Sequence, residues 1–357
     1  MGKELKGLVL SGGAGTRLRP ITHTSAKQLV PVANKPVLFY GLTALRDAGV
    51  TDIGIIVGDT HAEIEAAVGD GSSLGIRVTY IRQDAPLGLA HAVLTAEPFL
   101  GDHPFVMYLG DNLLRDGITE LVTRFRDSAP DAMILLQQVP DPESYGVAEL
   151  AGDQVVRLEE KPKEPRSDLA LVGVYMFTTA IWESAKAIKP SARGELEITD
   201  AIQHLIDRGL RVEPHRVSGW WKDTGRLDDM LEANRLILDV MEHRIDGEVV
   251  RSTVEGRVVL EAGARLVDSS VRGPAIIGAG ALIENAYIGP YTAISPGVTI
   301  RHAEVEHSII LDDSRIENLD ARVEASLVGR GVTIARTDEK PRAYRFMVGD
   351  SSSIGIV

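Results

Sequence analysis

The chain of 357 residues contains no cysteine, and this absence removes several kinds of chemistry at once. Disulfide bonds, thiolate nucleophiles and cysteine-ligated zinc sites are all excluded. The sequence also lacks a run of about 18 or more apolar residues, and no basic-then-apolar leader follows Met1. A membrane span and a secretory signal are therefore not expected, and we predict a cytoplasmic protein without a membrane partner.

Positive charge is scarce as well. Lys and Arg number 38 against 51 Asp and Glu, which gives a formal net charge of −13. Nucleic-acid-binding proteins carry a basic surface, so no nucleic-acid partner is expected. If the ligand is a polyphosphate, the few cations must gather where it binds, and a divalent metal must assist them. The length of the chain makes two domains the default expectation.

Residues 10–28, LSGGAGTRLRPITHTSAKQ, follow a strand-like stretch and form a candidate phosphate-binding loop. Glycines at positions 12, 13 and 15 let backbone N–H groups approach a phosphate closely. Positive charge comes from Arg17, Arg19 and Lys27. The alternative interpretation is a tight turn with a solvated basic rim.

The loop matches neither of two common glycine motifs. A P-loop needs Lys followed by Ser or Thr after its last glycine, where this chain has Thr16 and Arg17. A dinucleotide-binding fingerprint needs a glycine where Leu18 stands. The loop therefore indicates neither of the enzyme classes that carry those motifs.

Strand-like and helix-like stretches alternate from residue 6 to residue 244, which predicts helices packed on a mainly parallel sheet. In such sheets ligands bind beyond the carboxyl ends of the strands, where both the glycine loop and the triplet Gly110–Asp111–Asn112 fall. We expect strands at 5–10, 52–57, 77–82, 105–109, 132–139 and 171–177, and helices at 36–48, 89–96, 117–126, 196–207 and 226–244.

The pattern then changes to a repeat of six residues. Aliphatic side chains recur at this interval at Ile276, Leu282, Ile288, Ile294 and Ile300. A hexapeptide period is the signature of a parallel β-helix, in which one aliphatic residue per side fills the interior. The register slips after Ile300, and a capping tail is expected from about residue 335. A string of short antiparallel strands is the alternative. The flat faces and open ends of a β-helix suit packing against copies, so a homo-oligomer is expected.

Asp111 and Asp223 are the candidate metal ligands. Mg²⁺ takes few protein carboxylates and completes its shell with water and phosphate oxygens. An isolated Asp after a strand is also a common turn or cap residue. Phosphate-transfer chemistry needs alignment and charge neutralisation, which assigns Arg17 to a pyrophosphate leaving group and Lys27 to the α-phosphate. The alternative for each cation is a solvated surface position.

A second charged group, residues 159–162 (Glu-Glu-Lys-Pro), lies near Tyr145 and Gly146 in the expected order of strands. Carboxylates accept hydrogen bonds from sugar hydroxyls, and a lysine can hold the phosphate of a sugar phosphate. The alternative is a solvated charged face. Residues 193–200 are likewise either part of a site or a loop with helix-starting acids.

Taken together, these segments resemble the sugar nucleotidyltransferases, and most closely the long form of those that use dTTP. The likeness rests on residues 10–20, 25–32, 83, 86–90, 110–112, 145–147, 159–162, 193–200 and 221–225, in this order. It implies a Rossmann-like α/β nucleotidyltransferase domain with a mixed sheet over residues 1–244. A left-handed parallel β-helix of hexapeptide repeats, with a C-terminal tail, is implied over residues 245–357.

The resemblance also implies a role for each matching residue. Catalysis is assigned to Arg17 and Lys27, and metal binding to Asp111 and Asp223. The residues expected to bind the nucleotide are Leu10, Gly12, Gly13, Gln28, Gln83, Pro86, Gly88 and Asp111. Those expected to bind the sugar phosphate are Asn112, Tyr145, Gly146, Glu160, Lys161, Val172 and Gly173.

The implied reaction joins dTTP and α-D-glucose 1-phosphate by direct in-line attack with Mg²⁺, giving dTDP-glucose and pyrophosphate. A UTP-dependent uridylyltransferase is the nearest rival, and His91, which stands where short forms have Gln, leaves the nucleotide preference open. A second rival adds an acyltransferase centre in the β-helix, with His302 or His307 as base. A third is a regulatory subunit that binds sugar nucleotide without catalysis, against which the four charged site residues argue.

Overall fold

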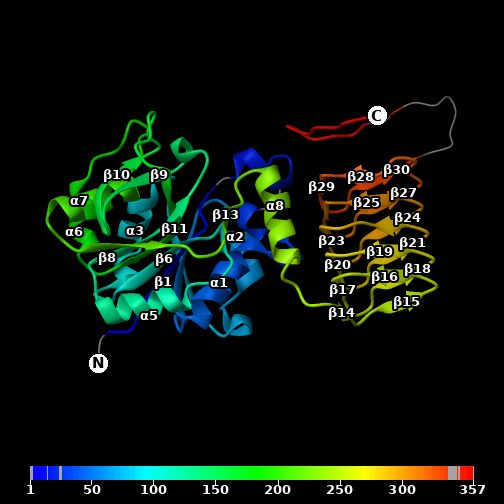
Figure 1. Ribbon diagram of the computed structural model, residues 1–357, viewed down its shortest axis with the longest axis horizontal. Helices are drawn as coiled ribbons and strands as arrows, with labels where there is room; N and C mark the ends of the chain where they lie inside the picture. Colours follow the sequence, from blue (N-terminus) through cyan, green and yellow to red (C-terminus); the bar gives the residue numbers. More distant parts are fainter. Residues whose placement is uncertain (1–2, 14, 24–25, 337–343, 345, 357) are drawn as a thin grey trace. The chain divides into compact units, whose positions relative to one another are not determined.

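The computed structural model describes residues 3–13, 15–23, 26–336, 344 and 346–356, and these fall into two compact units (Figure 1). The first unit takes residues up to 14, residues 26–29 and residues 37–223. The second takes residues 15–25, 30–36 and 224–357. The sequence predicts a boundary between two independently folding domains at residue 244. This boundary stays a prediction.

The first unit contains a mixed sheet in the order β10-β9-β11-β6-β1-β4-β5, in which β8 also pairs with β11, and β12 pairs with β8. Strands β6, β1, β4 and β5 are parallel, as the alternating pattern predicts. The expectation of a mainly parallel sheet is wrong for the other half, because β11 runs antiparallel to β6, β8 and β9. A two-residue turn at Gly152 and Asp153 joins β9 to β10, and such a short connection is possible only between antiparallel strands. The mixed sheet implied by the family resemblance is confirmed. The strands are β1 (Lys6–Leu10), β4 (Asp52–Val57), β5 (Arg77–Arg82), β6 (Phe105–Leu109), β8 (Ala132–Gln138), β9 (Gly146–Ala151), β10 (Gln154–Glu160), β11 (Leu169–Phe177) and β12 (Val212–Arg216).

Helices cover both faces of this sheet. Along β11, Val172, Val174 and Met176 face one core, and Tyr175 and Phe177 face the other. Burial on both faces explains why the central strands are almost continuously apolar. The four helices predicted before residue 208 are confirmed, with ends shifted by one or two residues. One face carries α1 (Val37–Asp47), α2 (His61–Val68) and α5 (Thr119–Ser128), and the other carries α3 (Leu89–Thr95), α4 (Glu97–Leu100), α6 (Ile181–Ala187) and α7 (Ile198–Asp207).

A short ribbon adjoins the sheet and joins distant parts of the chain. Strand β7 (Asn112–Leu114) follows β6 directly, and β13 (Trp221–Asp223) comes more than a hundred residues later. The two strands pair antiparallel, with Asn112 opposite Asp223. This pairing brings the end of β6 next to the last residues of the first unit.

The second unit contains a parallel β-helix of three sheets, whose coils follow one another from β14 to β30 (Figure 1). Through most of the stack one coil takes 17 residues, as from Ala275 on β20 to Thr292 on β23. The coil then shortens to 16 residues between Ala293 and Ile309, which confirms the predicted slip after Ile300. The fold is consistent with the left-handed form. The sheets are β14 (Arg244–Ile245), β17 (Val258–Leu260), β20 (Ala275–Ile277), β23 (Thr292–Ile294), β26 (Ile309–Ile310) and β29 (Leu327–Val328); β15 (Glu248–Val250), β18 (Arg265–Val267), β21 (Leu282–Glu284), β24 (Thr299–Arg301), β27 (Arg315–Glu317) and β30 (Thr333–Ala335); and β16 (Thr253–Glu255), β19 (Ser270–Arg272), β22 (Tyr287–Ile288), β25 (Glu304–Glu306) and β28 (Val323–Glu324).

The interior residues differ in part from those predicted. Ile288, Ile294 and Ile300 are fully buried in the core of the coil, as expected. The prediction is wrong for Ile276 and Leu282, because Ile277 and Ile283 occupy the interior instead. A coil of 17 residues has two sides of six residues and one side of five. Counting back from Ile288 in steps of six therefore reaches residues that point outward rather than inward.

One outer face of the β-helix is apolar and buried. Val259, Ile276, Ala293 and Ile309 point outward from the β14 sheet, yet each is less than 5 % exposed. Helix α8 (Leu227–Leu238) and the hairpin of β2 (Pro31–Val32) and β3 (Lys35–Pro36) lie against this face. This cover explains why Ile276 is buried although it points away from the interior.

Side-chain amides tie α8 and the hairpin to the coil. The buried Asn234 accepts a hydrogen bond from the Ala33 N–H at 2.9 Å and donates to the Tyr291 carbonyl at 2.9 Å. Asn34 Nδ2 donates to the Ile294 carbonyl at 2.7 Å. The predicted helix over 226–244 is too long, since Arg244 already belongs to the first strand of the β-helix.

The end of the chain follows the last coil. Strand β30 ends at Ala335, where the tail was predicted to begin. Residues 337–343 and 345 lie outside the described residues, and residues 346–356 form no helix or strand. Among the residues that the structure describes, no helix has the length and apolar character needed to cross a membrane.

Candidate active site

The glycine loop begins directly after β1, at the carboxyl end of a central parallel strand. A Cβ on Gly13 would lie 3.1 Å from Lys27 Cε, closer than side chains normally pack. A Cβ on Gly12 would meet Gln83 Oε1 at an ordinary 3.6 Å. The glycine at position 13 therefore allows the lysine side chain to lie against the loop backbone.

Lys27 reaches from this loop to the end of β6. Its Nζ donates to Asp111 Oδ2, and the two side chains are only 15 % and 14 % exposed. A buried ion pair holds each charge in place because removing one partner leaves the other charge uncompensated. The candidate phosphate ligand and the candidate metal ligand are thus direct neighbours.

Asp223 lies beside Asp111 through the β7–β13 ribbon. It pairs across the ribbon with Asn112, the residue that follows Asp111. Carboxylate oxygens suit Mg²⁺, which needs only one or two protein carboxylates when a substrate supplies phosphate oxygens. Within the described residues no cluster of three or more His, Asp or Glu could hold a metal. The two carboxylates by themselves are of the type that Mg²⁺ accepts as ligands.

Two buried polar atoms near the loop lack a partner. Gln28 is 1 % exposed and Ser11 is fully buried. Gln28 Oε1 and Ser11 Oγ make no hydrogen bond to any residue that the structure describes. A buried acceptor left unpaired costs about 1–3 kcal/mol. A ligand that brings a hydrogen-bond donor to Gln28 would remove this cost.

The loop around Gly88 is held against a segment that follows a hundred residues later. Gly88 has φ +104°, and a Cβ there would lie 2.4 Å from the Leu196 carbonyl oxygen. The Leu196 N–H donates to the Leu87 carbonyl at 2.8 Å, and the Ala90 N–H donates to the Leu196 carbonyl at 3.0 Å. Only glycine permits this approach.

Gln83 and Pro86 flank that loop in different ways. Gln83 Nε2 lies 2.9 Å from His91 Nδ1, so the histidine that departs from the family pattern fixes the amide of a predicted base-binding residue. Pro86 is exposed. The contact between Gln83 and His91 was not expected from the sequence.

The side chain of Asn112 is fixed by the indole of Trp221, a residue to which the sequence assigned no role. Trp221 Nε1 donates to Asn112 Oδ1 at 2.5 Å, and the Tyr145 ring meets the Trp221 ring edge-on at 5.3 Å. A Cβ on Gly173 would lie 2.7 Å from the same Asn112 oxygen. These contacts bring Asn112, Tyr145 and Gly173 together, and their role in binding a sugar phosphate stays a prediction.

Val172 and Leu10, two predicted site residues, have buried side chains that a ligand could not reach. Val172 is fully buried in the core, and Leu10 is 8 % exposed. Their side chains pack among apolar neighbours on the two faces of the sheet. Any contact with a ligand must therefore come from their N–H or C=O groups.

Glu160, at the end of β10, belongs to a charged network. Its Oε2 accepts from Thr199 Oγ1 at 3.2 Å, and Arg193 lies 3.5 Å from its Oε1. Arg193 also donates to both carboxylate oxygens of Glu197 at 2.9 Å. Burial and then the neighbouring Glu197 raise the pKa of Glu160. Residues 193–200 thus form part of the Glu160 surroundings rather than a plain loop.

Gly146 and Lys161 also lie next to Glu160. A Cβ on Gly146 would lie 3.0 Å from Glu160 Oε2 and 2.6 Å from the Thr199 methyl group, so glycine is required there. The Lys161 N–H donates to the Tyr145 carbonyl at 2.9 Å, and Lys161 itself is exposed. The sequence signal for Thr199 and Arg193 was only their place in a family motif.

Arg17 belongs to the second unit. It lies on a 3₁₀ turn, η1 (Thr16–Leu18), whose N-cap is Gly15 with φ +62°. Its side chain is exposed, whereas the neighbouring Leu18 is 4 % exposed. The turn therefore presents the guanidinium outward and anchors itself through the leucine.

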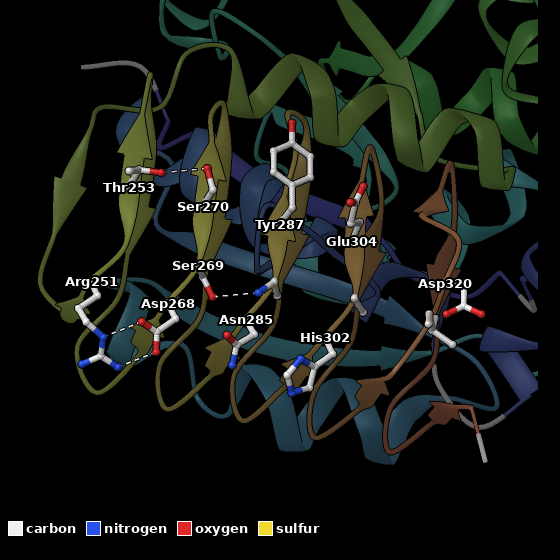
Figure 2. A pocket seen from close by; sticks show the side chains of 13 residues that line it. Arg251, Thr253, Asp268, Ser269, Ser270, Asn285, Tyr287, His302, Glu304 and Asp320 are labelled. Atoms are coloured by element: carbon white, nitrogen blue, oxygen red, sulfur yellow. Dashed lines mark hydrogen bonds and ion pairs between the residues drawn. The ribbon is translucent and has the colours of Figure 1, made fainter. Parts of the chain in front are cut away.

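The β-helix carries a separate shallow groove of about 680 Å³, shown in Figure 2. Its wall follows a corner where Arg251, Asp268, Asn285 and His302 stack at intervals of 17 residues with positive φ. Arg251 and Asp268 form two hydrogen bonds of 2.6 Å. His307 packs edge-on against Tyr291 instead, with ring centres 6.2 Å apart. The acyltransferase hypothesis for His302 or His307 stays a prediction.

The chain is similar to known proteins over nearly its whole length. A family model described as "Nucleotidyl transferase" matches residues 6–240. The chain is 57 % identical over 355 residues to the glucose-1-phosphate thymidylyltransferase of Streptomyces antibioticus, and the match covers 99 % of both chains. It is 49 % identical to the low-salt glycan biosynthesis nucleotidyltransferase of Haloferax volcanii over 98 % of this chain and 99 % of that one.

A solved structure shows the same fold. The crystal structure of a Bacillus anthracis protein assigned as a glucose-1-phosphate thymidylyltransferase, in complex with sucrose, matches with a TM-score of 0.63 at 38 % identity. The match covers 67 % of this chain and 98 % of that one. The remaining part of the present chain is therefore additional to that structure.

Proposed function

Because the chain belongs to the nucleotidyl transferase family, we propose that it transfers a thymidylyl group from dTTP to α-D-glucose 1-phosphate, giving dTDP-glucose and pyrophosphate. The observation that carries this proposal is the 57 % identity to a glucose-1-phosphate thymidylyltransferase over 99 % of both chains. An identity spread over both units supports the same substrates as well as the same fold.

The base is assigned to the buried end of the glycine loop. A pyrimidine such as thymine has a ring N–H between two carbonyls, and this donor would satisfy the unpaired Gln28 Oε1. Gln83, fixed by His91, supplies a second amide just after the end of β5. The backbone of Leu10, Gly12 and Gly88, together with Pro86, completes the nucleotide side of the proposed site.

The phosphates are assigned to the loop and its cations. Gly12 and Gly13 offer backbone N–H groups, and Lys27 holds its charge against the loop. Arg17 follows the last loop glycine by two residues, and we assign it to the pyrophosphate leaving group. Charge builds on the leaving oxygens during transfer, so fixed cations there lower the barrier.

Asp111 and Asp223 are the residues that would hold Mg²⁺, which would neutralise phosphate charge when bound. The pairing of Asp223 with Asn112 supports this assignment because it sets both carboxylates at the end of β6. Lys27 already compensates the charge of Asp111 from the loop side. The ion pair with Lys27 thereby holds the Asp111 carboxylate in place.

The sugar phosphate is assigned to the residues around Glu160. Glu160, held by Thr199 and Arg193, offers carboxylate oxygens to sugar hydroxyls. The exposed Lys161 is assigned to the phosphate of the sugar. Asn112, Tyr145, Gly146 and the backbone of Val172 and Gly173 complete this side. The reaction needs no covalent enzyme intermediate, because an aligned sugar-phosphate oxygen can attack the α-phosphorus directly.

A substrate matrix tests the proposal. Pyrophosphate release would be measured with dTTP or UTP against glucose 1-phosphate and two other sugar 1-phosphates, in the presence of Mg²⁺. We expect the highest kcat/KM for dTTP with glucose 1-phosphate. A higher value with UTP would favour the uridylyltransferase, and no release with any pair would favour a regulatory subunit.

We also propose a cytoplasmic homo-oligomer, assembled partly through the β-helix. At its first coil, Ile245 and Val249 are 37 % and 39 % exposed, and among the described strands those that carry them pair on one side only. Open coil ends of this kind favour association with another chain. Light scattering on Val249→Glu tests the assembly, since a charge at the open end should reduce the mass.

A further inference from the structure

The segment that carries Arg17 is short and is held mainly by its own hydrogen bonds. The Leu18 N–H donates to the Gly15 carbonyl at 3.0 Å, and Thr22 Oγ1 donates to the same carbonyl at 2.6 Å. Two 3₁₀ turns, η1 and η2 (Ile21–His23), make up most of the segment. Such turns have poor hydrogen-bond geometry, so neighbouring parts of the chain must help to fix their position.

The last coils of the β-helix provide the first such neighbour. A Cβ on Gly329, just after β29, would lie 3.4 Å from Ile21 Cδ1. The isoleucine therefore rests on the backbone of the coil at its C-terminal end. Residues 15–25 and the β-helix belong to the same compact unit.

The C-terminal tail provides the second neighbour. The ring nitrogen Nε2 of His23 lies 3.3 Å from the Asp350 carbonyl oxygen, which accepts a hydrogen bond from it when Nε2 carries the proton. A Cβ on Gly349 would lie 4.0 Å from Pro20 Cβ. The tail turns at this point, with the Ser352 N–H donating to the Gly349 carbonyl at 3.4 Å. Pro20 and His23 thus both meet the same tail turn.

We infer that the tail turn at residues 349–352 is a positioning element for Arg17, which it acts on through Pro20 and His23. This inference rests on the proposed function, because it concerns the placement of a cation assigned to the leaving group. Transfer reactions are sensitive to such placement, since a displacement of about 1 Å can lower a rate by about 10²-fold.

Two tail glycines give a matched pair of variants. Gly349 faces Pro20, whereas a Cβ on Gly355 would meet no atom of the described residues within 4 Å. In the full chain, Gly349→Leu should push the turn away from Pro20 and lower kcat by about tenfold. Gly355→Leu should keep the activity of the unmodified chain. The KM for dTTP should change little in both, because the inference concerns Arg17 in the transition state.

His23 gives an independent test with a rescue. His23→Ala removes the contact with the Asp350 carbonyl and should lower kcat, whereas His23→Gln retains an N–H donor and should restore most of it. Thermal unfolding of each variant is measured alongside. A purely structural role for His23 would change the unfolding temperature and would not separate kcat from KM.

The outcomes decide between the alternatives. Low kcat in Gly349→Leu and His23→Ala, with near-normal kcat in the two matched variants and unchanged unfolding, supports the positioning role. Equal activity in all four variants, or equal loss in Gly349→Leu and Gly355→Leu, overturns it while leaving the proposed function intact. An unmodified chain that transfers no thymidylyl group would instead overturn the proposed function, and this inference with it.

Discussion

The ion pairs of the two units differ in burial and in how they are formed along the chain. Lys27 and Asp111 lie 84 residues apart and are 15 % and 14 % exposed. Arg265 and Glu248 in the β-helix lie 17 residues apart, one coil, and both are 55 % exposed. An exposed pair contributes about 0–1 kcal/mol, whereas each partner of a buried pair depends on the other. Oppositely charged side chains therefore form a buried pair within the proposed site of one unit and a solvated surface pair on the other.

Buried polar groups show the same contrast. In the β-helix, Ser269 Oγ donates to the Val267 carbonyl at 2.7 Å and accepts from the Ala286 N–H at 3.1 Å. In the first unit, Gln28 Oε1 and Ser11 Oγ have no partner among the described residues. The repeat satisfies this hydroxyl within its own neighbouring coils. The two atoms near the glycine loop are the ones that we propose a ligand would satisfy.

The largest effect is expected from a charge in the interior of the coil. Ile288→Asp places an unpaired carboxylate in a fully apolar core, and we expect a loss of at least about 3 kcal/mol of unfolding free energy. Leu282→Asp is the matched control, since Leu282 is only half-buried and points outward. Denaturant unfolding followed by circular dichroism measures both. Equal losses would mean that the interior is assigned to the wrong residues.

The next effect concerns the two carboxylates of the proposed metal site. Asp111→Asn and Asp223→Asn should each lower kcat by about 10²-fold or more, because a main source of charge stabilisation is lost. The fold should remain intact by circular dichroism. Asp116→Asn, an exposed acid paired with Arg115, should keep normal turnover. Near-normal Mg²⁺-dependent turnover in either site variant would refute the assignment.

Arg17 is expected to act on rate rather than on binding. Arg17→Ala should lower kcat by at least about tenfold and leave the KM for dTTP nearly unchanged, since the charge that it meets grows in the transition state. Steady-state kinetics of pyrophosphate release measures both constants, with Arg46→Ala as a surface control. A rise in KM alone would show that Arg17 only anchors the nucleotide.

A surface pair of the β-helix should matter little. Arg265→Ala removes the exposed contact with Glu248 and should lower the unfolding free energy by less than about 1 kcal/mol. Added salt should reduce the difference further, because it screens exposed charges. A loss as large as that of Ile288→Asp would mean that the cross-coil pairs hold the coil together.

The smallest effect is a pH trend. Because the pKa of Glu160 is raised, the folded chain binds this proton more tightly than the unfolded chain does. Wild-type stability should therefore fall as the pH rises from the ordinary glutamate value through the raised one. Glu160→Gln cannot ionise, so its unfolding temperature should exceed that of wild type above this range and match it below. A difference that does not vary with pH would contradict the shift.

The sequence by itself determined the features that depend on neighbouring residues. The interval of six predicted the β-helix, and the glycine loop followed by Arg17 and Lys27 predicted a phosphate site. Apolar runs fixed the central strands, since a strand buried on both faces needs little information from elsewhere. The family was evident from several short motifs in order, and the comparisons confirmed it.

Only the tertiary structure decided which distant groups meet. The contact of Gly88 with Leu196, the indole of Trp221 on Asn112, and the approach of Arg193 to Glu160 all join segments that lie far apart in sequence. The interior of the coil is another such case, because one side with five residues moved it from Ile276 to Ile277. Periodicity shows that a face exists, but packing against the rest of the chain selects the residues that are buried and the polar atoms that stay available to a ligand.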